Sequence, residues 1–147
     1  MIDILSGLLT PLIAIVTVAI LVLQYLLAKR RWRLDLYDKR YPVYLATMQY
    51  LSSIVQNADI TNDDLIKFLR NSKDKEFLFG KDVQEYLEQL YNKGGRLRYL
   101  VKKLEIEPVG EKRGKLVDEE MDLVEWFSKQ FKESEKHFGK YLKIDKK

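Results

Sequence analysis

The strongest pattern along the chain is an uncharged, mostly apolar run from Ile4 to Ala28, which basic residues follow at once. A helix needs about 20 predominantly apolar residues to cross the hydrocarbon layer of a membrane. We therefore predict a single transmembrane helix with a basic end over residues 1–31. Residues 32–147 are expected to form a separate helical domain.

Two other interpretations of this run are weaker. A cleaved signal peptide has positive charges before its apolar core and small residues at its cleavage site. Here the positive charges follow the run, and residues 24–27 read Gln-Tyr-Leu-Leu. A helix buried in a soluble core seldom has so long an uncharged stretch.

The next segment has apolar residues at alternating steps of three and four. It covers residues 32–56 and is expected to continue the membrane helix. Pro42 predicts a kink or a break there, because its ring blocks one backbone hydrogen bond. The apolar stripe consists of Leu34, Tyr37, Tyr41, Tyr44, Met48, Leu51 and Val55. A stripe with this spacing is expected to face partner helices.

A short helix is predicted over residues 62–72. Thr61 and Asp64 have the spacing of a capping box, in which each side chain binds the backbone N–H of the other residue. The residues expected to face inward are Leu65, Ile66, Phe68 and Leu69. Residues 76–80 then read as a brief apolar turn that a glycine closes.

Two longer helices complete the pattern. One covers residues 81–105, with Gly94 on its apolar seam, where a glycine permits a close helix crossing or a kink. The other begins near Asp118, after a loop over residues 107–114. The predicted fold class is all-α, with a single N-terminal transmembrane helix followed by a small antiparallel helical bundle.

Charge changes this picture next to the apolar run. The net charge is +4, and residues 29–40 hold six basic and two acidic side chains. Basic residues beside a span stay in the cytoplasm, which predicts an outside N-terminus and a cytoplasmic helical domain. Such a band suits anionic lipid headgroups rather than nucleic acid. The expected headgroup contacts are Lys29, Arg30, Arg31 and Arg33.

One face of the apolar run carries small or polar residues. They are Gly7, Thr10, Ala14, Thr17 and Gln24. Small residues let helices approach closely in lipid, and Thr or Gln can hydrogen-bond across the contact. This face is a candidate for self-association; the alternatives are a lone anchor whose Thr hydroxyls bond to their own backbone, and the lining of a narrow pore.

Candidate catalytic and metal-binding residues are few. The chain has no Cys, which excludes disulfides and thiolate metal sites. His137 is the single histidine, and the sequence places no nucleophile beside it. The acidic residues 119–125 suit a helix start better than a calcium loop, and residues 110–114 lack the ending of a phosphate-binding loop. We therefore expect no catalytic residue, no metal site and no cofactor.

Aromatic residues at two places are candidate partner contacts. A buried tyrosine needs a hydrogen-bond partner for its hydroxyl, so a row of tyrosines suits an interface with one wet edge. The apolar turn could be an exposed recognition motif, although a plug packed on the bundle is favoured, because apolar patches rarely stay exposed in monomers. The candidate residues are Tyr37, Tyr41, Tyr44, Phe77, Leu78 and Phe79.

Four stretches occur in a recognisable order: Pro11–Ala14, Arg33–Tyr41 with its LDLYDKR motif, Glu76–Gly80 (EFLFG), and Trp126–Phe127 with Phe138–Leu142. In them the chain resembles, over almost its whole length, a widespread uncharacterised family of small bacterial single-pass membrane-anchored helical proteins. The resemblance implies a bacterial inner-membrane protein and brings no catalytic residue with it. Pro42 departs from the family pattern.

These observations predict a non-enzymatic, membrane-tethered interaction or regulatory module on the cytoplasmic face of a bacterial inner membrane. Its expected partners are membrane lipid and either a second copy or another protein, and no nucleic acid is expected. An alternative is an effector that oligomerises and perturbs the membrane. A membrane-surface enzyme is the weakest alternative, because no nucleophile, metal set or phosphate loop supports it.

Overall fold

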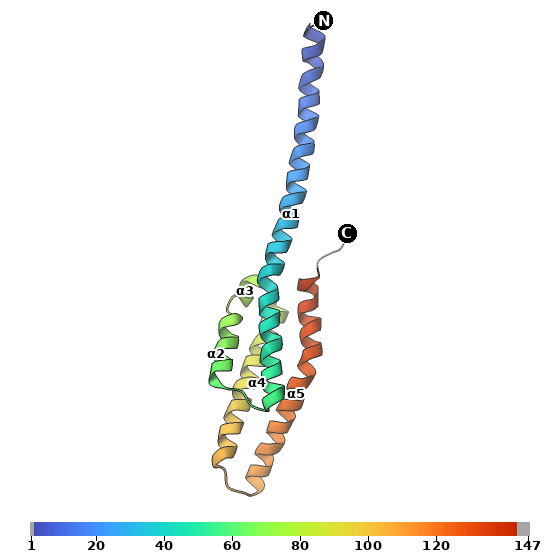
Figure 1. The fold of residues 1–147 in the computed structure, drawn as a ribbon. Helices are drawn as coiled ribbons and strands as arrows, with labels where there is room; N and C mark the ends of the chain where they lie inside the picture. The colour runs from blue at the N-terminus through green and yellow to red at the C-terminus, as the bar shows by residue number, and fades with distance from the viewer. Residues whose placement is uncertain (1, 144–147) are drawn as a thin grey trace. The chain divides into compact units, whose positions relative to one another are not determined.

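The computed structural model describes residues 2–143, with side chains at residue 7 and residues 9–143. These residues form helices and no strand, which confirms the predicted all-α class (Figure 1). The chain divides into two compact units, Met1–Leu36 and Tyr37–Lys147. The helices, in order, are α1 (Ile2–Asn57), α2 (Asn62–Asn71), α3 (Lys75–Leu78), α4 (Lys81–Ile106) and α5 (Glu111–Leu142).

The first unit is the early part of α1. Its large apolar side chains between Leu9 and Leu27 are all exposed, from 48% at Ile20 to 67% at Ile15. This helix near the N-terminus is long and apolar enough to span a membrane, and none of its most apolar stretch is buried. The helix also passes Pro11 without a break.

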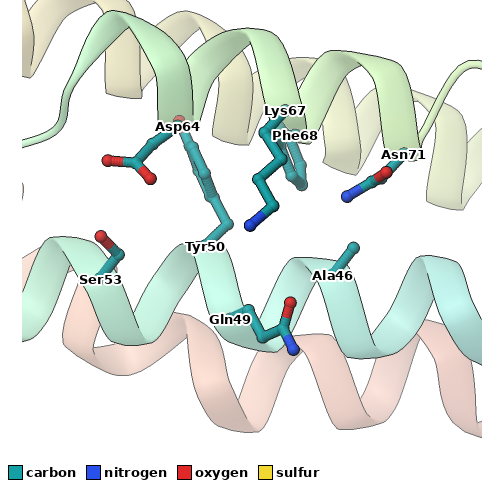
Figure 2. A pocket seen from close by; sticks show the side chains of 8 residues that line it. All are labelled: Ala46, Gln49, Tyr50, Ser53, Asp64, Lys67, Phe68 and Asn71. Atoms are coloured by element: carbon teal, nitrogen blue, oxygen red, sulfur yellow. The ribbon is translucent and has the colours of Figure 1, made fainter.

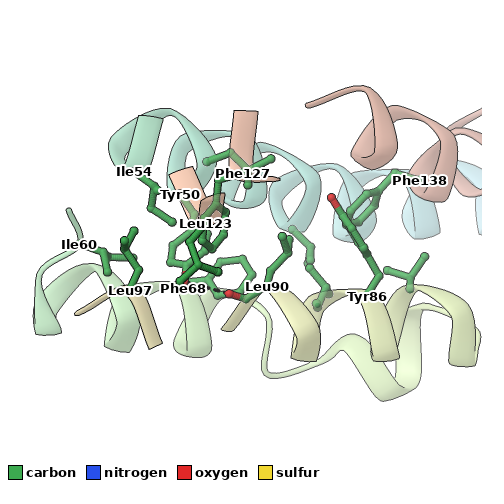
Figure 3. Close-up of a cluster of buried hydrophobic side chains, with 14 of the residues drawn as sticks. Tyr50, Ile54, Ile60, Phe68, Tyr86, Leu90, Leu97, Leu123, Phe127 and Phe138 are labelled. Carbon is green, nitrogen blue, oxygen red and sulfur yellow. Dashed lines mark hydrogen bonds between the residues drawn. The ribbon is translucent and has the colours of Figure 1, made fainter. Parts of the chain in front are cut away.

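The second unit has one apolar core, to which the later part of α1, the other four helices and the connecting segments contribute (Figure 3). The best-buried side chains come from α1, α4, α5 and the segment before α2. They include Leu51, Ile54, Ile60, Val83, Leu87, Leu90, Leu97, Leu100, Phe127 and Phe138. The seam predicted for residues 81–105 is therefore largely confirmed, with Tyr86 and Leu100 added to it.

Of the kink or break predicted at Pro42, the break is wrong, because α1 remains helical through this residue. A proline inside a helix removes a single backbone hydrogen bond. The next turn is held by burial, since Val43 and Thr47 both lie in the core. The Thr47 hydroxyl donates to the Val43 carbonyl at 2.8 Å, which satisfies this buried polar group.

The core-facing side of α1 differs from the stripe predicted from the sequence. The buried residues are Val43, Thr47, Tyr50, Leu51 and Ile54. Most of the predicted stripe lies one residue further on and is half-buried or exposed. Both stripes have helical spacing and share Leu51, and Tyr44, Met48 and Val55 of the predicted stripe pack against the core without being fully buried. The buried stripe includes a threonine, which hydrophobicity alone would not select.

The capping box before α2 is confirmed. The Asp64 backbone N–H donates to the Thr61 hydroxyl at 3.1 Å, and the Thr61 N–H donates to the Asp64 carboxylate at 3.2 Å. The prediction that Ile66 and Leu69 face inward is wrong, because they are 53% and 49% exposed. This ten-residue helix presents only Phe68 to the core as a fully buried side chain.

The last helix begins at Glu111, seven residues before the predicted start at Asp118. The intervening loop is correspondingly short. Arg113 donates through Nη1 to the Leu104 carbonyl and, at 2.7 Å, to the Glu107 carbonyl. A cation at the C-terminus of a helix satisfies free carbonyls and complements the helix dipole. The side chain of Arg113, in the stretch between two glycines that had indicated a loop, therefore caps the end of α4 from the first turn of α5.

Gly94 allows α1 and α4 to pack closely. A Cβ atom at this position would lie 1.8 Å from the Tyr50 hydroxyl oxygen and 3.0 Å from its ring. The Tyr50 hydroxyl uses this space to donate to the Leu90 carbonyl at 3.2 Å. Burial raises the pKa of Tyr50 well above its ordinary value, so the hydroxyl stays protonated and remains a donor. Of the close crossing or kink predicted at Gly94, the structure shows that the glycine leaves room for the Tyr50 side chain of α1.

Gly94→Ala is expected to destabilise the second unit by about 1–3 kcal/mol, the usual cost of overpacking. Gly95→Ala is the matched control, since a Cβ at Gly95 meets nothing within 4 Å and alanine favours a helix. The measurement is the urea midpoint in detergent, followed by near-ultraviolet circular dichroism. Equal midpoints for the two variants would contradict the close crossing.

Candidate functional site

Arg40 of α1 binds two segments that lie far from it, and from each other, in the sequence. Its Nε donates to the Leu78 carbonyl at 2.8 Å, and its Nη1 donates to the Tyr141 carbonyl at 3.5 Å. The guanidinium also lies over the rings of Phe79 and Tyr141, at 5.9 and 5.2 Å from their centroids. One cation therefore holds the end of α3 and the end of α5, where helix dipoles favour positive charge.

Tyr141 extends this cluster to the start of α4. Its hydroxyl donates to Asp82 Oδ1 at 2.7 Å and accepts the Gly80 backbone N–H at 3.0 Å. A Cβ at Gly80 would lie 2.5 Å from that hydroxyl oxygen, so glycine leaves room for the contact. We call Arg40, Leu78, Phe79, Asp82 and Tyr141 the Arg40 cluster.

The charges of this cluster are balanced locally. Lys140 Nζ lies 2.8 Å from Asp82 Oδ2. The hydrogen bond from Lys140, with a smaller contribution from Tyr141, lowers the pKa of the Asp82 carboxyl. Conversely, the bond to Asp82 raises the pKa of Lys140. Both groups stay ionised at neutral pH and tie the two helices together.

The three tyrosines predicted as partner contacts form a row of rings on α1. Tyr37 and Tyr41 stack with centroids 5.6 Å apart, and Tyr41 lies 6.2 Å from Tyr44. Tyr44 meets the edge of Phe138 at 5.4 Å, which joins the row to the core. Tyr41 is 42% exposed, while Tyr37 and Tyr44 are half-buried. Burial is the main cause that raises the pKa of Tyr44.

The apolar turn splits between the core and the surface. Phe79 is 5% exposed and packs edge-on against Phe138 at 5.2 Å and Tyr141 at 5.3 Å. Leu78 is half-buried, and Phe77 is 86% exposed. The expectation that Phe79 contacts a partner is therefore corrected, because its ring is enclosed within the second unit. Phe77 is the residue of this turn that a partner can reach.

The predicted lipid contacts and the association face lie in the first unit. Lys29, Arg30, Arg31 and Arg33 are exposed. The small-residue face, Gly7, Thr10, Ala14, Thr17 and Gln24, is exposed as well. The Thr17 hydroxyl donates to the Ile13 carbonyl at 2.8 Å within its own helix. This is the bond expected of a lone anchor, although it leaves the threonine free to accept a second bond.

The residues considered for chemistry have structural partners. His137 stacks on Tyr86 at 4.3 Å, and the Tyr86 hydroxyl lies 2.7 Å from the Ser134 hydroxyl. Burial raises the pKa of Tyr86 to about 12. Glu119 accepts two bonds from Arg96, at 2.7 and 2.9 Å. Among the side chains that the structure describes, no three of His, Asp or Glu come together in a group that could hold a metal ion.

A shallow groove of about 310 Å³ lies between α1 and α2 (Figure 2). Its lining residues are Ala46, Gln49, Tyr50, Ser53, Asp64, Lys67, Phe68 and Asn71. The rings of Tyr50 and Phe68 stack on each other at 4.1 Å, so the faces they share are closed to a ligand. The groove follows from the small side chains Ala46 and Ser53, which sequence reasoning did not single out.

The Arg40 cluster brings together three of the motifs noted in the sequence, namely the stretches Arg33–Tyr41, Glu76–Gly80 and Phe138–Leu142. Sequence reasoning recognised the motifs but missed that Arg40 and Tyr141 join them. No family model, curated protein or solved structure matches the chain. The site is therefore interpreted from its own geometry.

Arg40→Ala is expected to lower the free energy of unfolding of the second unit by about 1.5–3 kcal/mol, the range for hydrogen bonds to charged groups. Arg40→Lys should recover only part of this, because an ammonium lacks the planar fork of donors. Lys39→Ala changes the exposed neighbour and serves as the control. Urea unfolding in detergent measures all three, and equal midpoints for Arg40→Ala and Lys39→Ala would contradict the role of the cluster.

The contacts of Asp82 predict that the stability of the folded protein depends on pH in the acidic range. Because the folded state lowers the pKa of Asp82 below its ordinary 3.8, its contribution is present above that pH and is lost as the pH falls through the folded value. Asp82→Asn should therefore destabilise the protein at neutral pH, and the difference from the wild type should shrink in acid. Glu88→Gln, an exposed change elsewhere on α4, is the control. Parallel curves of thermal midpoint against pH for wild type and Asp82→Asn would refute the linkage.

Proposed function

We propose that this chain is a non-enzymatic module tethered to the cytoplasmic face of a bacterial inner membrane. Its helical unit binds a second copy or a partner protein there. The observation that carries the proposal is the fully exposed apolar surface of early α1, in the same helix as the tyrosine row. The resemblance noted from the sequence motifs points to the same class, and membership of that family is part of the proposal.

The tether is supported by the contrast between the two parts of α1. A core helix of comparable apolarity would be buried, whereas the segment from Leu9 to Leu27 has no buried side chain. Exposed apolar surface of this extent is typical of membrane or partner contact. The basic residues that follow favour a cytoplasmic location for everything after them.

The interaction role is supported by the tyrosine row. Its rings are fixed by stacking, and Tyr41 remains accessible. Rigid aromatic side chains supply contact area with little loss of conformational freedom, and tyrosine is frequent at interfaces. A membrane tether makes later encounters nearly intramolecular, so weak contacts become sufficient. Self-association through Gly7, Thr10, Ala14, Thr17 and Gln24 would act in the same direction.

The antiparallel bundle predicted from the sequence is part of this proposal. Its support is the order of contacts between α4 and α5. Asp82 pairs with Lys140, Tyr86 meets Ser134, and Arg96 pairs with Glu119. As residue numbers rise along α4, those of the partners on α5 fall, as expected for opposite helix directions. Such a bundle would present the tyrosine row on a rigid element.

Site-specific photocrosslinking in intact cells tests the proposal. A photoreactive amino acid replaces Tyr41 or, as the matched control, Tyr99, which is similarly exposed at 48% but lies outside the proposed surface. The Tyr41 probe should give a discrete adduct in the membrane fraction, either with a second copy or with one defined protein. The Tyr99 probe should not give this adduct. Identical adduct patterns at the two positions, or recovery of the protein outside the membrane fraction, would overturn the proposal.

A further inference from the structure

Phe77 is the most exposed aromatic side chain that the structure describes in the second unit, at 86%. It lies on the four-residue helix α3, between Glu76 and Leu78. The neighbouring Phe79 already anchors this turn in the core, so the fold does not need a second aromatic residue here. An exposed phenylalanine on an ordered turn is available to a surface that could cover it.

We propose that Phe77, with the lysines around it, docks onto the surface of an anionic lipid bilayer. The inference rests on the proposed tether and adds a second, reversible membrane contact to it. The contact would hold the helical unit against the bilayer that the apolar segment crosses. Lipidic interfaces suit aromatic rings that are flanked by basic side chains.

The charges around the turn favour anionic lipid over a protein partner. The segment that carries the turn, residues 73–81, has three lysines, Lys73, Lys75 and Lys81, and none of them has an ion-pair partner among the described side chains. Its acidic residues are Asp74 and Glu76, while the adjacent Asp82 is neutralised by Lys140. Basic side chains are thus in excess around the exposed ring, and an anionic surface complements them.

The turn is held in place well enough to present Phe77. The Phe77 and Leu78 backbone N–H groups both donate to the Asp74 carbonyl, at 3.0 and 3.2 Å. The Leu78 carbonyl accepts the bond from Arg40. Arg40 follows Ala28, the end of the uncharged run, by twelve residues, or about 18 Å of helix. A link of this length allows the turn to reach the membrane surface.

Val109 provides a matched contrast. It is 96% exposed and apolar, and it lies in the loop between α4 and α5. The 26 residues of α4 separate it from the turn that carries Phe77, which corresponds to about 39 Å along the helix. If exposure of an apolar residue were enough for lipid contact, both positions would behave alike. The proposal instead requires that they differ.

Because the chain has no cysteine, single-cysteine variants test this directly. The full chain carries Phe77→Cys, Val109→Cys or Ile15→Cys, each labelled with an environment-sensitive fluorophore. The proteins are reconstituted in vesicles of phosphatidylcholine, with or without phosphatidylglycerol, that contain nitroxide-labelled lipid as quencher. In the anionic vesicles the label at 77 should be quenched severalfold more than the label at 109. High salt, or Lys73, Lys75 and Lys81 all changed to Gln, should bring position 77 down to the level of 109.

The three labels separate the possible failures. If the label at 15 is quenched and the labels at 77 and 109 are equally unquenched, the tether stands and the docking inference is overturned. If the label at 15 is not quenched either, the tether itself is wrong. If the label at 77 is shielded from an aqueous quencher as the protein-to-lipid ratio rises, without quenching by lipid, a second copy covers Phe77. That outcome also overturns the inference.

Discussion

The hydrogen bonds of the Arg40 guanidinium hold together the end of α3 and the end of α5 in the second unit, and the arrangement of these segments depends on them. Helix α3 has only four residues, too few to be stable on its own. Its terminal carbonyl needs a donor, which Arg40 supplies, while Tyr141 binds the first free N–H before α4. Two side chains thus satisfy backbone groups at the ends of α3, α4 and α5, and each bond holds two segments at once.

Local rules predicted much of the fold, because several elements depend on neighbouring residues alone. The capping box follows from the identity of two residues, Thr61 and Asp64, and the room for Tyr50 follows from the glycine at position 94. The buried side of α1 could not be predicted in this way. Two sets of residues on α1 have the same helical spacing, and the sequence does not show which set is buried. The buried set includes Thr47, which the core accepts because its hydroxyl donates to a carbonyl of the same helix. The start of α5 was missed for a related reason, because Arg113 caps the preceding helix from a stretch between two glycines.

The separate parts of the candidate site were predicted, but the contacts that join them were not. The tyrosine row and the apolar turn were recognised from their composition. Arg40, however, bonds to residues 38 and 101 positions away, and no spacing rule reaches so far. The two phenylalanines of the turn also end in different environments, since Phe77 is exposed on α3 and Phe79, with extended backbone after the helix ends, is buried in the core.

The early part of α1 sets a further physical condition. Its exposed apolar surface is unfavourable in water, at about 25 cal/mol for each Å². A helix is one of the few elements that lipid tolerates around its full circumference, because its backbone groups bond to one another. The amphipathic helices of the second unit have a core to cover one face, and this segment has none. The early part of α1 therefore needs an apolar environment other than the protein core to cover it. Lipid would cover this segment on every side at once. A single partner helix would cover only one face.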